Sequence, residues 1–220
     1  TIKAIHFHSC QFGIDECDFI CQTISKNARI TDFELSSDNF HTGHCEIFST
    51  LMKQTKTMKY LNLENNKIVG EGFEILSRGL AENKTLEILY LGYNIMREQG
   101  SRSICQSLMT NNHLQELYLD KNEIMGEACR AISSLIQKTK TLRKLDLSKN
   151  QIGVNGHEFI SEALETNSSL QELDLGNNSF HDQGCIAFSN FLSKNNTLRV
   201  LKFEKNGITT ESCQAIALKL

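Results

Sequence analysis

The chain of 220 residues contains no proline and no tryptophan. Proline makes up about 5% of average proteins, so roughly 11 would be expected at this length. Its absence excludes collagen and proline-rich disordered sequences, and it indicates short, regular connections. Hydrophobic residues make up 40% and charged residues 22% of the chain, as is ordinary for a folded globular protein.

Long apolar runs and an excess of one charge are also missing. No stretch approaches the roughly 18 apolar residues that cross a membrane, so we expect no membrane insertion. The formal net charge of −3 gives no overall signal for binding nucleic acid. The chain opens Thr1-Ile2-Lys3 without an initiator Met or the features of a signal peptide, so we expect a mature form or, in preference, an excised segment of a larger protein, in the cytoplasm.

One pattern recurs every 28 residues along the whole chain. It reads L-x-x-L-x-L-x-x-N-x-I and starts at Ile2, Ile30, Met58, Leu86, Leu114, Leu142, Leu170 and Leu198. The first two copies depart from it, because Cys10 and Asp38 stand in the asparagine position. Self-similarity at a fixed period of this length is the signature of a solenoid. The sequence therefore predicts one domain, residues 1–220.

Each repeat predicts a strand followed by a helix. The L-x-L run alternates with period two, as a half-buried strand does, and the asparagine that follows can satisfy backbone groups of the turn. Helical spacing then appears, as at Phe73, Leu76 and Leu80. The asparagine at the helix end, such as Asn83, is expected in the left-handed conformation. A small residue near the helix start is expected where neighbouring repeats come close: Gly72, Gly100, Ala128, Gly156 and Gly184.

The repeat resembles the leucine-rich repeat family in its ribonuclease-inhibitor-like branch. Residues 66–73 (NKIVGEGF), followed by Leu76, Leu80, Asn83 and Thr85, look like that branch's N-x-I-x-x-x-G-x-x-x-L-x-x-x-L-x-x-N-x-T consensus. The resemblance implies an α/β fold: a right-handed α/β solenoid, or horseshoe, of eight repeats with a parallel sheet on the concave face and helices on the convex face. Such arrays occur in NOD-like receptors, Ran GTPase-activating protein, tropomodulin and some bacterial effectors.

The cysteines also follow the repeat. One position is shared by Cys17, Cys45, Cys129, Cys185 and Cys213, and another by Cys21 and Cys105. Equivalent helical residues of adjacent repeats should lie about 10 Å apart, whereas a disulfide needs Cα atoms within about 7 Å. We therefore expect buried free thiols and a reducing compartment. Cys17 and Cys21, one helical turn apart, could instead form a metal or redox pair.

Positions two, four, six and seven residues after each repeat start should face the concave surface. All four tyrosines and nine acidic residues fall there, against five lysines. Tyrosine favours interface hot spots, and the acids would attract a partner protein with a basic or polar patch. The family consensus also favours tyrosine at two of these positions, so a repeat-consensus role is the alternative. We predict these partner-binding residues: Tyr60, Tyr90, Tyr93, Tyr118, Glu64, Glu116, Asp120, Asp146, Asp174 and Lys144.

No catalytic or cofactor motif accompanies the repeats. The chain lacks the phosphate-binding loop, the nucleophile elbow and the H-E-x-x-H zinc motif, so we expect no enzyme activity, no cofactor and no metal. His6 and His8, beside Asp32 and Glu34, could bind a metal, but a polar edge strand explains them equally.

These features predict a non-enzymatic protein-recognition module. The resemblance suggests the ligand-sensing or scaffold part of an innate-immune-type receptor, or a bacterial effector acting in the host cytosol. The acidic concave surface disfavours nucleic acid as a partner. Two alternatives stay open: a GTPase-activating regulator, with Arg97 and Arg102 as candidate residues, and an actin-capping array like that of tropomodulin.

Overall fold

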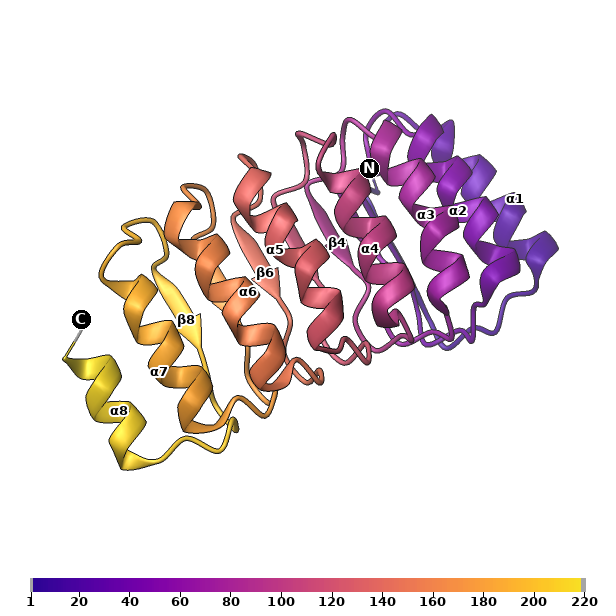
Figure 1. The fold of residues 1–220 in the computed structure, drawn as a ribbon. Coiled ribbons are helices and arrows are strands. Elements are labelled where there is room, and N and C mark those ends of the chain that lie inside the picture. Colours follow the sequence, from indigo (N-terminus) through magenta and orange to yellow (C-terminus); the bar gives the residue numbers. More distant parts are fainter. Residues whose placement is uncertain (1, 219–220) are drawn as a thin grey trace.

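The computed structural model describes residues 2–218, with their side chains except those of residues 190, 192, 211 and 215. Residues 1, 219 and 220 of the predicted domain lie outside the described residues. Strands and helices alternate along the chain (Figure 1). The strands are β1 (Ala4–His8), β2 (Asp32–Ser36), β3 (Tyr60–Asn62), β4 (Ile88–Tyr90), β5 (Glu116–Tyr118), β6 (Lys144–Asp146), β7 (Glu172–Asp174) and β8 (Val200–Lys202).

Each strand is followed by a helix. The helices are α1 (Ile14–Ser25), α2 (Thr42–Gln54), α3 (Gly70–Glu82), α4 (Arg97–Leu108), α5 (Cys129–Lys138), α6 (Gly153–Thr166), α7 (His181–Leu192) and α8 (Thr210–Ala217). A 3₁₀ turn, η1 (Gly126–Ala128), precedes α5. In the described part of the chain, no helix has the length and apolar character needed to cross a membrane.

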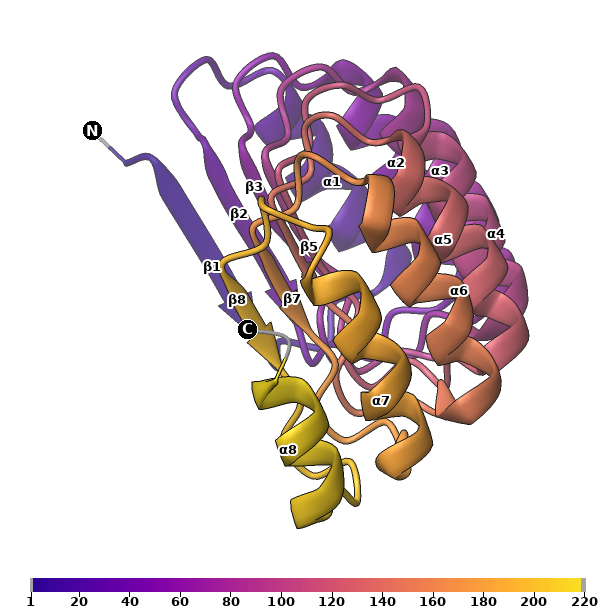
Figure 2. The same ribbon diagram turned by 60° about the vertical axis from the view of Figure 1, so that its left-hand side comes forward.

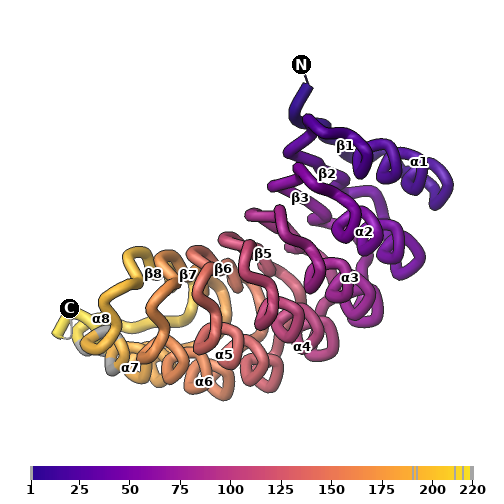
Figure 3. The backbone as a smooth tube through the Cα atoms, turned by 90° about the horizontal axis from the view of Figure 1, so that it is seen from above, coloured from indigo at the N-terminus to yellow at the C-terminus, as the bar shows by residue number. Residues whose placement is uncertain are grey.

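The eight strands form one sheet in sequence order, and every neighbouring pair is parallel. Paired residues of neighbouring strands are 28 positions apart, as Leu61 is from Leu89 and Leu89 from Leu117. The sheet lines one side of the molecule and the helices the other (Figure 2). From above, the strands follow the inner side of an arc and the helices the outer side (Figure 3). The predicted α/β solenoid is confirmed.

The hydrophobic core lies between the sheet and the helices. The strand leucines Leu61, Leu89 and Leu117 are fully buried there, as are Phe73 and Leu80 of the helical half. Burial weakens at the two ends of the array: Ile2 is 71% exposed, and Leu198 is only partly buried. The end repeats contact one neighbour instead of two, so part of their apolar surface stays uncovered.

A ladder of buried asparagines joins the turns after the strands: Asn66, Asn94, Asn122, Asn150, Asn178 and Asn206. Asn150 shows the pattern. Its Oδ1 accepts the backbone N–H of Asn122 at 2.8 Å and of Ile124 at 3.1 Å. Its Nδ2 donates to the carbonyls of Leu119 at 3.0 Å and Leu147 at 2.9 Å. Each amide therefore satisfies backbone groups of two repeats, and the predicted role of this position is confirmed.

Asp38 interrupts this ladder in the second repeat. It is buried, and its Oδ1 accepts the backbone N–H of Gln11 at 2.7 Å. Its Oδ2 is also buried and has no hydrogen-bond partner. A carboxylate cannot donate, so the bonds that the Nδ2 group makes in later repeats are missing here.

The expected left-handed asparagine at the helix ends is wrong. Asn83 has φ −69° and ψ 136°, which is extended backbone. The side chain ends the helix by hydrogen bonding: Nδ2 donates to the Met52 carbonyl at 2.7 Å, and Oδ1 accepts the Leu86 N–H at 2.7 Å. Left-handed residues occur instead just after each strand, where the chain turns sharply toward the helix: Ser9, Ser37, Asn65, Tyr93, Lys121, Lys149, Asn177 and Lys205.

Small residues and thiols meet where neighbouring helices pack, as expected. A Cβ atom on Gly72 would lie 2.8 Å from Cys45 Sγ, and one on Gly156 would lie 2.8 Å from Cys129 Sγ. All eight cysteines are free; six are buried, whereas Cys10 and Cys213 are exposed. Cys213 occupies the shared position, but within the described residues α7 is the one helix that packs against α8, whereas the inner helices have a neighbour on each side.

Burial keeps the thiols of Cys45, Cys129 and Cys185 protonated. It raises the pKa of Cys45 and Cys129 to about 12 and that of Cys185 to about 11. The pKa of Cys21 is raised by its hydrogen bond with Cys17 and by burial. Thiols in this state are poor nucleophiles and poor metal ligands, which argues against a reactive Cys17–Cys21 pair.

Candidate functional site

Three of the four tyrosines form a stack on the concave face. Tyr60, Tyr90 and Tyr118 come from β3, β4 and β5, and the ring centroids of Tyr60 and Tyr90 lie 5.4 Å apart. Those of Tyr90 and Tyr118 lie 3.9 Å apart, with the ring planes 5° from parallel. The parallel register places Tyr90 and Tyr118 directly beside each other, which produces the stack. All three side chains are half-buried, and we call them the tyrosine stack.

Polar neighbours orient the hydroxyl groups of the tyrosine stack. The Tyr118 hydroxyl donates to Glu116 Oε2 at 2.7 Å, and Asn62 Nδ2 donates to the Tyr60 hydroxyl at 3.4 Å. Lys144 Nζ lies 5.2 Å from the centroid of the Tyr118 ring. Burial raises the pKa of Tyr60 and of Tyr118, so both hydroxyls stay neutral. The stack thus combines apolar aromatic area with hydrogen-bonding hydroxyl groups.

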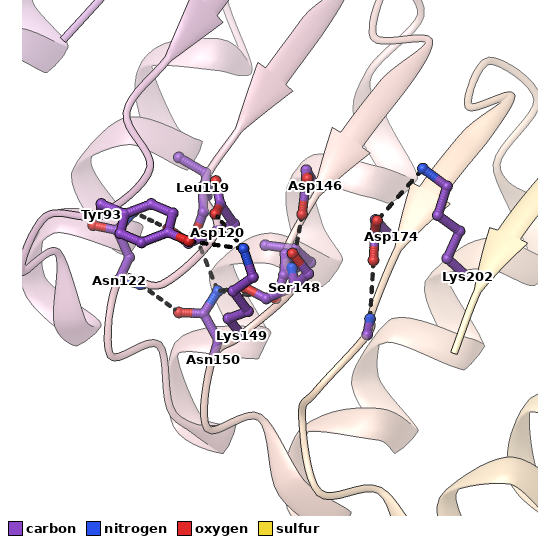
Figure 4. A network of polar contacts seen from close by, with 12 residues as sticks. Tyr93, Leu119, Asp120, Asn122, Asp146, Ser148, Lys149, Asn150, Asp174 and Lys202 are labelled. Atoms are coloured by element: carbon purple, nitrogen blue, oxygen red, sulfur yellow. Dashed lines mark hydrogen bonds and ion pairs between the residues drawn. The ribbon is translucent and has the colours of Figure 1, made fainter. Parts of the chain in front are cut away.

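Tyr93 lies apart from the tyrosine stack, at the turn that follows β4. Its φ is 54°, an uncommon conformation for a bulky residue. Lys149 Nζ donates to the Tyr93 hydroxyl at 2.9 Å, and Lys121 Nζ lies 4.6 Å from the ring centroid. Lys149 Nζ also lies 3.6 Å from Asp120 Oδ2 (Figure 4). Tyr93 and the two lysines line a hollow of about 390 Å³, separate from the stack.

Three carboxylates run beside the tyrosine stack, and we call Glu64, Asp120 and Asp146 the acidic row. Burial is the main cause that raises the pKa of each. Repulsion adds to it: Asp120 raises the pKa of Glu64, and Asp146 raises that of Asp120. Asp146 Oδ1 accepts the Ser148 N–H at 2.8 Å. The acidic row therefore holds negative charge that its surroundings compensate only in part.

The charges nearer the C-terminal end are paired within the protein. Lys202 Nζ lies 3.5 Å from Asp174 Oδ2 (Figure 4). It also lies 2.9 Å from Glu172 Oε1. Lys144 Nζ lies 3.1 Å from Glu172 Oε1. The hydrogen bond from Lys202 lowers the pKa of Glu172. Asp174 is only 8% exposed, and its Oδ1 accepts the Gly176 N–H at 3.0 Å. Asp174 and Lys144 therefore both make their polar contacts within the protein.

The predicted site residues fall into distinct groups. The tyrosine stack and the acidic row lie together, and Glu116 and Lys144 contact the stack, whereas Tyr93 and Asp174 lie outside it. Sequence reasoning missed the contact between Lys149 and Tyr93, which are 56 residues apart. Two repeat lengths separate them, so aligning the repeats in columns would have placed them two strands apart.

Other candidate residues are occupied by local contacts. His6 Nδ1 lies 3.8 Å from Glu34 Oε2, and His8 Nδ1 lies 2.7 Å from Ser36 Oγ. Across residues 2–218, no three His, Cys, Asp or Glu side chains gather in a group that could hold a metal ion. Arg97 Nε lies 2.8 Å from Glu123, and Arg102 lies 2.6 Å from Glu98, all on exposed side chains.

Comparison with known proteins supports the repeat architecture. A family model described as a leucine-rich repeat matches residues 110–133, 139–161, 166–189 and 194–217. A search of the curated proteins found no match. The structure is similar to the tropomodulin C-terminal domain of Caenorhabditis elegans, with a TM-score of 0.53 and 13% identity, over 62% of this chain and 83% of that one.

A weaker similarity is to a structure titled leiomodin-1 actin-binding site 2. Its TM-score is 0.45 at 16% identity, over 70% of this chain and 72% of that one, which supports no conclusion about this chain. The 28-residue pattern, the parallel eight-stranded sheet and the family match agree with one another. The chain is therefore an α/β solenoid of 28-residue repeats, and a leucine-rich repeat model matches four segments of it.

Proposed function

We propose that the chain binds a partner protein through its concave face, with the tyrosine stack as the central contact. The observation that carries this proposal is a set of three mutually packed, half-exposed aromatic rings on one face of the sheet. Rings held by their neighbours lose little conformational freedom on binding, and tyrosine offers both apolar area and a hydroxyl. Such residues dominate the energy of protein interfaces.

The acidic row indicates the charge that the proposed partner should carry. Glu64, Asp120 and Asp146 lie close enough for their charges to raise one another's pKa values. Within the row, Lys149 Nζ lies 3.6 Å from Asp120 Oδ2, whereas lysines also pair with Asp174 and Glu172 elsewhere on this face. A basic patch on the partner would relieve the repulsion in the acidic row, and we infer a partner that combines such a patch with apolar area.

The proposal extends to the wider setting of the chain. We infer that it is the recognition segment of a larger receptor-type or effector protein in a reducing, cytoplasmic compartment. The buried free thiols support the reducing setting. The paired states of Arg97 and Arg102 give no support to a GTPase-activating role. Rates of GTP hydrolysis and of actin filament elongation, each measured with and without the protein, test the two alternatives directly.

An affinity experiment tests the concave face. The chain and a triple variant (Tyr60→Ala, Tyr90→Ala, Tyr118→Ala) are used to capture partners from a lysate, which are identified by mass spectrometry. A matched control is Phe19→Ala, because Phe19 is an aromatic residue of α1 that is 74% exposed. We expect the triple variant to lose partners that the control retains, while thermal melting shows both variants folded. Identical partners for all three proteins would refute the proposal.

A further inference from the structure

The rim where the helices end and the strands begin carries a second surface of opposite charge. A groove of about 710 Å³ lies there, lined by the loops that follow α1 to α5. Five basic side chains line it: Lys56, Lys59, Lys84, Lys140 and Arg143. We call the groove with these side chains the basic rim groove. Glu87 is the acidic residue of the lining.

The repeat aligns these cations in two columns. Lys56, Lys84 and Lys140 occupy the same position of the second, third and fifth repeats. Lys59 and Arg143 share the position three residues further on. Neighbouring strands lie about 4.8 Å apart, so the first column extends over about 15 Å along the rim.

Four of the five cations have no internal counter-charge. Lys59 Nζ lies 2.8 Å from Glu87 Oε1. Within residues 2–218, no carboxylate lies within 4.0 Å of the charged groups of Lys56, Lys84, Lys140 or Arg143. Arg143 donates from Nη1 to the Ser169 carbonyl at 3.3 Å, which leaves most of its donors free.

The helix dipoles account for only part of this charge. All five helices point their C-terminal ends at the groove, and each end carries a partial charge of about −0.5, or about −2.5 together. Lysine and arginine are therefore favoured there. Four unpaired cations exceed that partial charge, so a net positive field remains along the groove.

We propose that the basic rim groove binds an extended acidic segment of a partner protein. Side chains on one face of an extended chain repeat about every 6.7 Å, so carboxylates at alternate positions can reach successive long lysine side chains. The planar guanidinium of Arg143 can take one carboxylate with two parallel hydrogen bonds. The lining contains no Phe, Tyr or Trp, and His113 is its one aromatic ring, which favours an acidic peptide over a single-stranded nucleic acid that needs a series of stacking rings.

This inference does not rest on the tyrosine stack. The groove adjoins that stack, because Lys59 immediately precedes Tyr60, the first residue of β3, and Arg143 precedes Lys144, the first residue of β6. The two surfaces nevertheless differ in the sign of their charge. They are therefore suited to chemically different ligand segments, and variants in one leave the other intact.

A peptide-binding titration tests the groove. The probe is a fluorescein-labelled decapeptide of alternating Glu and Ser, followed by fluorescence anisotropy. The test variant carries Lys56→Glu, Lys84→Glu, Lys140→Glu and Arg143→Glu. The control carries the same charge change at Lys67→Glu, Arg78→Glu, Arg130→Glu and Lys205→Glu, in helices or in the turns after strands. We expect saturable binding that weakens at least about tenfold in the test variant and is almost unchanged in the control.

Further variants and probes in the same titration distinguish the possible causes of a loss of binding. A second variant with Gln at the four groove positions guards against misfolding of the reversed one, and it should also lose binding. The Tyr60, Tyr90 and Tyr118 triple variant should bind the peptide normally, so failure here is distinct from failure of the concave-face proposal. Equal binding of a Gln-Ser peptide, equal loss in the control, or stronger binding of a deoxythymidine oligomer would each overturn the proposal.

Discussion

Tyr90 and Tyr118 lie ring against ring on neighbouring strands, with centroids 3.9 Å apart, closer than the usual spacing of the strands themselves. The register pairs these two residues directly, so their contact follows from the 28-residue period. Tyr60, one strand earlier and on the adjoining row, extends the stack at a tilt of 48°. The result is a continuous aromatic surface built from three repeats.

Mutual support within the stack should be measurable as a coupling energy. Tyr90→Ala and Tyr118→Ala each remove one ring and expose the face of the other. The double-mutant cycle, measured by urea unfolding, should show a coupling of about 0.5–1.5 kcal/mol beyond additive effects. Tyr93→Ala paired with Tyr118→Ala serves as control, because no ring contact joins those two residues, and it should be additive. Strict additivity of the first pair would mean that the rings do not support each other.

Asp38→Asn should stabilise the protein. In later repeats the Nδ2 group donates to buried carbonyls, as Asn66 does to Leu35 at 3.1 Å, whereas Asp38 Oδ2 is buried without a partner. Restoring the donor should raise the free energy of unfolding by about 1–3 kcal/mol, measured by chemical denaturation. The reverse change, Asn150→Asp, should lower it by a similar amount. A loss of stability in Asp38→Asn would contradict this account of the ladder.

Gly79→Ala should destabilise the array although Gly79 lies inside helix α3. Alanine normally stabilises a helix interior by about 1 kcal/mol over glycine. Here the added Cβ would lie 2.5 Å from the Ser49 carbonyl oxygen and 2.7 Å from Ser49 Cα, both backbone atoms. We expect a net loss of about 1–3 kcal/mol in thermal or urea unfolding. Gly43→Ala is the control, since its nearest neighbour is a side-chain atom of Ile14 at 3.3 Å.

The acidic row should make stability fall as pH rises toward neutrality. The folded-state pKa values of Glu64, Asp120 and Asp146 are raised, so the folded protein binds more protons than the unfolded chain just above the ordinary carboxyl pKa. The free energy of unfolding therefore decreases as pH rises through that window. Urea unfolding followed over that range should show the decrease.

Two comparisons check the origin of this pH dependence. Asp120→Asn should reduce the decrease in the free energy of unfolding. Glu172→Gln instead removes a carboxyl group whose pKa is lowered by Lys202, a shift opposite in direction to that of Asp120. Binding of a basic partner should make the carboxyl groups of the acidic row release protons. Calorimetry of binding in buffers of different ionisation enthalpy detects this release. If the free energy of unfolding did not change with pH in either the parent protein or Asp120→Asn, the acidic row would not be the origin of a pH dependence.

Thiol reactivity should separate the cysteines by their place in the array. Cys10 and Cys213 are exposed, and the other six are buried. Ellman's reagent should therefore modify two thiols per folded chain quickly, and all eight after denaturation. The double variant Cys10→Ser, Cys213→Ser should show no fast phase. A fast phase at a buried position such as Cys45 would instead reveal local opening of the repeats.

The sequence by itself determined the fold and the position of each residue within its repeat. A strict 28-residue period leaves one way to pair the strands, so Leu61 must meet Leu89, and the asparagine position must follow each strand. It also placed the tyrosines on the concave face. Periodicity carries this information because equivalent residues of stacked repeats occupy equivalent places.

Only the tertiary structure decided which residues act together. It joined Tyr60 to Tyr90 and Tyr118 but separated Tyr93, which contacts Lys149 two repeats away. It also paired Lys202 with Asp174 and left the Asp38 carboxylate oxygen without a partner. Such outcomes depend on side-chain reach, burial and the charges of neighbours across several strands. A repeat pattern specifies columns of residues, whereas the direction and partner of each side chain arise only when the columns pack side by side.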